Sequence, residues 1–151
     1  MRTSIKTRLF GTVAVLCWLS ACSATPTLVL PTESGLTDAT LAAMLAARPL
    51  ADGQNVRADL VASSPALSTH LVQVRTREAS HLHAQHDLVV TLLRGHGTLH
   101  AGGRAFPMRA GDVASVPRGT VHYFVNDGGG PAVALATFAP PHDGTDQVPA
   151  P

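Results

Sequence analysis

Four histidines are the residues of this sequence best suited to chemistry. His81, His83 and His86 fall within a stretch of six residues, and His122 follows further along the chain. Side chains two residues apart in a strand share a face, so His81 and His83 are expected on one side of a strand. Neutral imidazole is a common ligand for divalent transition metals. The spacing therefore predicts a metal site rich in histidine.

Short strands must position these histidines. Segments rich in Val, Leu and Thr begin near residue 56, and turns separate them in a chain with 13 Gly and 11 Pro. Such regular spacing is typical of a β-sandwich or β-barrel. We therefore predict an all-β fold. Its expected strands cover residues 69–75, 88–93, 98–101, 112–116, 121–125 and 132–138.

A run of fixed positions surrounds His122. Gly111 begins a tight turn into a strand, Pro117 ends that strand, and Gly119 turns the chain back toward His122, with Asn126 four residues later. This run matches G-x5-P-x-G-x2-H-x3-N at every defining position, and so resembles the second motif of the cupin family. Arg118, inside the turn, is expected to be exposed or to orient an anionic ligand at the rim.

The first cupin motif is matched only in part. Residues 81–83 supply its histidine pair and Gly95 its closing glycine. Leu88 stands where the family has a glutamate, Asp87 precedes it, and Arg75 replaces the opening glycine. The chain thus resembles a small single-domain bacterial cupin of the RmlC-like superfamily. The resemblance implies a jelly-roll-like β-barrel with a short N-terminal helix.

Cupin metals usually sit among three histidines and one glutamate. By resemblance, the imidazole ligands are His81, His83 and His122. Leu88 cannot replace a carboxylate, so the fourth position is left to His86, to water, or to Asp87 turned inward by a bulge. A site without a carboxylate favours zinc, nickel or copper; iron and manganese are the family's other metals.

The N-terminus is predicted to be an export signal. Arg2, Lys6 and Arg8 precede an apolar run that ends in Leu-Ser-Ala-Cys at 19–22, which resembles a bacterial lipobox. Residues 1–21 would be removed and Cys22 would carry lipid. Ser23 rather than Asp after the cysteine favours the outer membrane, facing the periplasm. Without its three leading cations the formal net charge falls from +1 to −2. We therefore expect a membrane anchor and no nucleic-acid partner.

The exported chain divides into three parts. Residues 22–35 are predicted to be a flexible tether and residues 36–142 the cupin domain. Residues 143–151 are predicted to be a tail in a loop. Within the domain, Thr37 is expected to cap a helix over 38–47 that packs outside the barrel. His142 is expected in a surface loop, whereas His70 could line the barrel.

Three functions fit this pattern. The first is a metal-binding cupin lipoprotein of the cell envelope, which holds an ion and a small polar ligand in its barrel. The second is a metal-dependent oxygenase, isomerase or lyase, so whether the chain is an enzyme is left open. The third is a metal-free envelope protein that binds a partner. Homodimers are common in the family, and a homodimer is expected on that resemblance alone.

Overall fold

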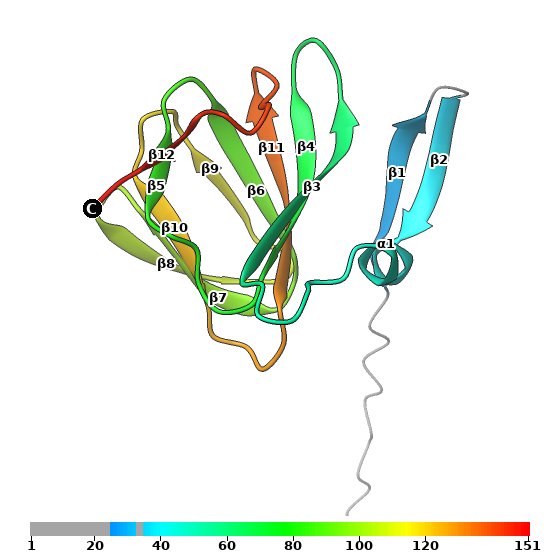
Figure 1. Ribbon diagram of the computed structural model, residues 1–151, viewed down its shortest axis with the longest axis horizontal. Coiled ribbons are helices and arrows are strands. Elements are labelled where there is room, and N and C mark those ends of the chain that lie inside the picture. Colours follow the sequence, from blue (N-terminus) through cyan, green and yellow to red (C-terminus); the bar gives the residue numbers. More distant parts are fainter. Residues whose placement is uncertain (1–24, 33–34) are drawn as a thin grey trace, which may run out of the picture.

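The computed structural model describes residues 25–32 and 35–151, and its main body consists of two five-stranded sheets (Figure 1). The first sheet has the order β12-β5-β10-β7-β8. Its strands are β12 (Gln147–Pro149), β5 (His81–His83), β10 (His122–Asn126), β7 (His96–Ala101) and β8 (Arg104–Arg109). The second sheet has the order β3-β4-β11-β6-β9. Its strands are β3 (Val56–Ser63), β4 (Ser68–Val74), β11 (Ala132–Ala139), β6 (Asp87–Arg94) and β9 (Val113–Val116).

The predicted all-β fold is confirmed, and each predicted strand segment matches an observed strand within a few residues. Strand β8 was not predicted, because Pro107 interrupts its pattern. Proline is tolerated there because β8 lies at an edge of the first sheet. The strands of the main body pair antiparallel in two separate sheets, so the fold is a jelly-roll sandwich rather than a continuously bonded barrel.

Alternation along the strands separates an inner from an outer face of the second sheet. On β11, Ala132, Ala136 and Phe138 point between the sheets, whereas Val133 points outward. The inward residues join a core with side chains of the first sheet such as Leu99. This period of two is the reason that β3, β4, β11 and β6 each contribute to two different apolar clusters.

The N-terminal segment differs from its prediction. Residues 27–32, predicted as part of a tether, form strand β1 (Thr27–Thr32), which pairs with β2 (Gly35–Thr40) in a hairpin beside the second sheet (Figure 1). Leu28 is buried against the outer face of that sheet, in a cluster with the fully buried Leu71 and Val133. Burial of alternating apolar residues thus holds a segment whose prolines suggested an irregular chain.

Helix α1 (Leu41–Ala47) is shorter than predicted. Thr40, not Thr37, is its N-cap, and the Thr40 side chain accepts a hydrogen bond from the amide of Ala43. Thr37 is held in extended conformation by its pairing with Leu30 in the hairpin. The helix packs outside the sandwich as predicted, through the buried Leu41 and Met44. Among the described residues, no helix is long and apolar enough to cross a membrane.

The segment after β11 is also more ordered than predicted. Residues 140–149, which we call the C-terminal strap, lead into β12, and β12 pairs with β5 at the edge of the first sheet. Asp146 in the strap is buried. The strap therefore belongs to the domain rather than to a loose tail.

The turns around His122 follow the sequence motif. Gly111 and Gly119 have φ of +99° and +77°, a region that glycine occupies without steric cost. Strand β9 ends at Val116 before Pro117, and β10 begins at His122. These turns fix His122 at the start of a strand with its side chain buried.

Candidate metal centre

Three of the four predicted ligands meet between the sheets. His81 and His83 lie on β5, and His122 lies on β10 directly opposite His81 in the antiparallel register. One ring nitrogen from each histidine lies within 4.8 Å of the others. All three side chains are buried, with exposed fractions of 6%, 5% and 4%. We call these residues the histidine triad.

Backbone carbonyls orient two of these rings. Nδ1 of His81 lies 2.8 Å from the carbonyl oxygen of Ala79, and Nδ1 of His122 lies 2.9 Å from that of Thr120. A carbonyl oxygen only accepts, so each Nδ1 donates its hydrogen and Nε2 keeps a free lone pair. Such an outer hydrogen bond fixes the tautomer of metal-binding histidines. Nδ1 of the third ring, His83, is buried with no partner among the described residues.

The surroundings favour the neutral form of His83 and His122. The pKa of His83 is lowered to about 4, mainly by burial and further by positive charge on His81, His122 and His142, against the opposing charge of Asp146. Burial also lowers the pKa of His122, against a hydrogen bond to the Thr120 carbonyl that raises it. Metal ligation requires a neutral imidazole. The donor set therefore fits a divalent transition metal.

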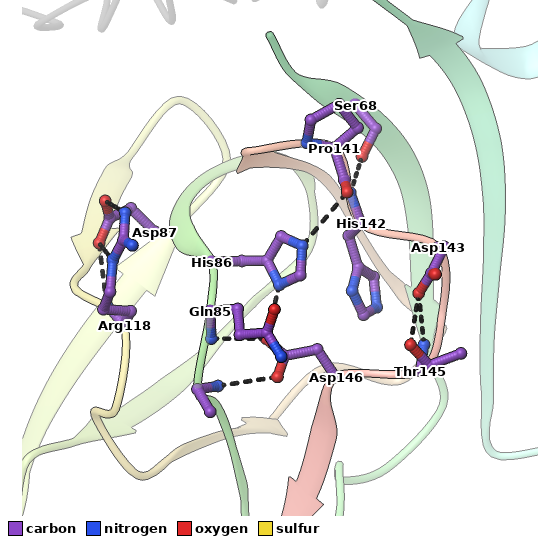
Figure 2. A network of polar contacts seen from close by, with 11 residues as sticks. Ser68, Gln85, His86, Asp87, Arg118, Pro141, His142, Asp143, Thr145 and Asp146 are labelled. Atoms are coloured by element: carbon purple, nitrogen blue, oxygen red, sulfur yellow. Dashed lines mark hydrogen bonds and ion pairs between the residues drawn. The ribbon is translucent and has the colours of Figure 1, made fainter. Parts of the chain in front are cut away.

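His86 lies outside the triad, contrary to its prediction as a fourth ligand. Its Nδ1 lies 2.5 Å from a carboxylate oxygen of Asp146, and its Nε2 lies 3.2 Å from the carbonyl oxygen of Pro141. Figure 2 shows the ring held between these two acceptors. The two-residue alternation fails here because β5 ends at His83 and the chain then bends into β6 of the other sheet. Both ring nitrogens are occupied by protein.

Asp87, the acidic residue next to His86, also lies away from the triad. Asp87 forms an ion pair with Arg118 at 2.6 Å, and both side chains are about half exposed (Figure 2). Leu88 is buried and lines the cavity between the sheets, as its place in the motif requires. No carboxylate from 87–88 therefore joins the triad, and Arg118 is paired rather than free to hold an anion.

Glu78, His70 and His142 line the same cavity. Glu78 precedes β5, and its carboxylate accepts a hydrogen bond from the amide of Phe124 at 2.9 Å. Burial raises the pKa of Glu78, while His81 and that hydrogen bond oppose the shift. His142, predicted in a surface loop, packs its ring 5.0 Å from that of His83, and His70 packs 5.9 Å from His142. The sequence indicated a place in the cavity lining only for His70, because His70 was expected on a strand.

Hydrogen bonds to Asp146 and Ser68 hold the strap that carries His142. Asp146 accepts hydrogen bonds from the amides of Ala84 and Gln85 and from His86 (Figure 2). Burial opposes ionisation, but these hydrogen bonds together lower the pKa of Asp146. The backbone amide of His142 donates to the hydroxyl of Ser68 at 2.9 Å. The strap is thus attached at both of its ends beside the triad.

The triad opens into a cavity of about 640 Å³ between the two sheets. Such a volume is typical of sites for small molecules. The polar side chains of its lining lie on β5, on β10, before β5 and along the strap, with His70 on β4. The remaining lining is almost entirely apolar.

Comparisons with known proteins agree with this geometry. A family model described as "Cupin domain" matches residues 69–138. A relative from Aquifex aeolicus (strain VF5), described as an uncharacterized protein, is 41% identical over 85 residues, which are 56% of this chain and 69% of the relative. The chain belongs to the cupin family.

Solved structures share the fold at lower identity. KdgF from Halomonas sp. is similar with a TM-score of 0.56 and 22% identity, over 59% of this chain and 82% of that chain. The cupin domain of Cnp3 from Schizosaccharomyces pombe is similar with a TM-score of 0.57 and 15% identity, over 76% of this chain and 86% of that chain. These likenesses support the fold and leave the function to the site.

Proposed function

We propose that this protein is a metal-binding cupin lipoprotein of the cell envelope, in which His81, His83 and His122 hold a divalent transition metal and the cavity holds a small ligand. The observation that carries the metal part is the triad itself. Its three imidazoles are buried, their ligand atoms lie within 4.8 Å of one another, and two of them are oriented by backbone carbonyls.

The donor set bears on the kind of metal. Three neutral nitrogens without a carboxylate favour zinc, nickel or copper over manganese. Three protein ligands also leave a position for water or a ligand atom, as in catalytic rather than structural zinc sites. Because the ligands are neutral, the ion keeps its full charge and attracts an anionic group.

The envelope location is supported by the sequence alone. The cationic start, the apolar run and Cys22 lie outside the described residues. If Cys22 carries lipid, the domain is attached to a membrane through the segment that precedes β1.

Metal content tests the site. We expect mass spectrometry of the untagged domain to find about one equivalent of a transition metal for three convergent imidazoles. His122→Ala should lower the affinity at least about a hundredfold, since it removes one of three ligands. The matched control is His100→Ala, because His100 stacks on Tyr123 away from the cavity. Normal metal content in His122→Ala would refute the triad as the site.

Membrane fractionation tests the anchor. Cys22→Ala should release the protein from the membrane fraction, because the lipidated thiol is lost. Cys17→Ala is the matched control, since Cys17 lies within the segment expected to be removed. Equal membrane retention of both variants would refute lipid attachment at Cys22.

A further inference from the structure

The cavity has two unlike walls. The strands β3, β4, β11 and β6 of the second sheet give it one wall, on which every lining side chain except His70 is apolar. Most of these apolar side chains are Val or Ala, which leave room for a ligand. They are Val56, Ala58, Val72, Val74, Val90, Ala132, Ala134 and Ala136. We call the apolar lining of these four strands, without His70, the apolar wall.

The apolar wall offers a ligand no hydrogen bonds. Its backbone groups are paired within the sheet, where β11 is bonded to β4 on one side and β6 on the other. A hydroxyl buried without a partner costs about 1–3 kcal/mol. A sugar, which carries a hydroxyl on most of its carbons, would leave several of them unpaired here.

The charges around the cavity limit the ligand further. Among the described residues that line it, none is Lys or Arg, and the acids are Glu78 and the exposed Asp143. Phosphate groups are usually bound by Arg, Lys or clustered backbone amides. A metal at the triad would be the one strong positive charge in the lining, so a ligand has one place for one anionic group.

We propose that the cavity takes a small molecule with an apolar body and a single anionic oxygen head group, of the monocarboxylate class. The head lies at the metal held by His81, His83 and His122, and the body lies against the apolar wall. This inference rests on the proposed metal site and specifies its ligand. It differs from the small polar ligand expected from the sequence, because the apolar wall becomes visible only when the two sheets are assembled.

A series of carboxylates of increasing length is the direct probe. Acetate, butyrate and hexanoate would be titrated calorimetrically into zinc-loaded full chain and into metal-free protein. In the zinc form, affinity should rise about three- to fourfold for each added methylene, as expected for burial of apolar surface. 6-Hydroxyhexanoate, of the same length as hexanoate, should bind about tenfold more weakly, because its terminal hydroxyl would lack a partner. Metal-free protein should bind each acid at least about tenfold more weakly, because the head group loses its charged partner.

A polar substitution on the wall tests the placement of the body. Val72→Thr exchanges a methyl group for a hydroxyl at a cavity-lining position of β4. It should reduce the preference for hexanoate over 6-hydroxyhexanoate severalfold. Val89→Thr is the matched control, since Val89 is 41% exposed and does not line the cavity. Thermal unfolding of both variants is measured to check that they remain folded.

The outcomes separate the two proposals. A metal-loaded protein whose affinity ignores chain length, or that binds 6-hydroxyhexanoate as well as hexanoate, would overturn the ligand class and leave the metal site standing. Equal affinities with and without zinc would overturn the placement of the head group. Failure to bind zinc, nickel and copper alike would overturn the proposed function together with the head-group placement. Length dependence that requires zinc and responds to Val72→Thr supports the inference.

Discussion

The two sheets line one cavity with different side chains. The first sheet presents the histidine triad on β5 and β10 beside apolar residues such as Leu99, whereas the lining from the second sheet is apolar except for His70. Strand alternation decides which side chains point inward on both sheets, but the residue types differ. Burial among these side chains is the main reason that the pKa of His83 is lowered to about 4. The apolar surroundings thus favour the neutral imidazole that metal binding requires.

The largest effect is expected where the two walls meet. Phe138 is buried at the end of the apolar wall and packs edge-on against His83, with ring centroids 4.9 Å apart. Phe138→Ala should lower the free energy of unfolding by about 3–5 kcal/mol, because it leaves a cavity. Denaturant titration measures the change. Phe106→Ala is the control, because the Phe106 side chain on β8 is 37% exposed and its removal should lower the free energy of unfolding far less. Equal losses of stability in the two variants would show that Phe138 does not join the walls.

A carboxylate on the apolar wall is expected to have the next largest effect. Leu88→Glu places an acid at the buried position that holds glutamate in other cupins. In metal-free protein, Leu88→Glu should lower the free energy of unfolding by about 2–4 kcal/mol, because apolar burial is lost and a buried acid is left unpaired. Added manganese should restore stability and bind at least about tenfold more tightly than to the parent, because oxygen ligands suit that ion.

Leu88→Met is the control for this substitution. It keeps an apolar side chain of similar volume, so it should lower the free energy of unfolding by less than about 1.5 kcal/mol. Unchanged metal preference in Leu88→Glu would show that residue 88 does not face the ion.

Removing the strap's anchor should have a smaller, local effect. Asp146→Ala takes away the acceptor for the Ala84 and Gln85 amides and for His86. Hydrogen exchange at these two amides should accelerate, and proteolysis within 140–149 should become faster. Asp143→Ala, which removes an exposed acid bonded to Thr145 in the same strap, is the control. Equal exchange in both variants would contradict the anchoring role.

The smallest effect concerns the exposed pair outside both walls. Hydrogen bonds from the side chain and then the amide of Arg118 lower the pKa of Asp87 to about 2, so the charged carboxylate stabilises the folded state above its ordinary pKa of 3.8. Asp87→Asn should lower the unfolding temperature slightly at neutral pH, since exposed pairs are screened. The difference should vanish as the pH falls from about 4 to 2. A difference that grows on acidification would contradict this assignment.

Local pattern was sufficient to predict much of the fold and most of the triad. Gly111, Pro117 and Gly119 encode a turn that needs positive φ and a strand end, so the position of His122 followed from residues close to it. His81 and His83 followed in the same way from alternation within one strand. Asp87 and Leu88 lie on opposite faces of β6, as the alternation of a regular strand dictates, so no bulge turns Asp87 inward.

The rest depended on contacts between distant residues. His86 was predicted to be a ligand from the two-residue alternation of a strand, but that alternation ends with β5. Its hydrogen-bond partner, Asp146, is 60 positions away. His142 reaches the cavity on the strap, which Asp146 attaches to amides of the turn after β5 and which Ser68 binds at the His142 amide. The N-terminal hairpin acquires its order from burial of Leu28 against Leu71 and Val133. The sequence by itself determined strand alternation and the turns, because these depend on neighbouring residues, and it indicated the three triad histidines through their resemblance to cupin motifs. Only the tertiary structure decided which wall faces the triad and what holds the strap, because buried polar groups take whichever partner the assembled sheets bring near.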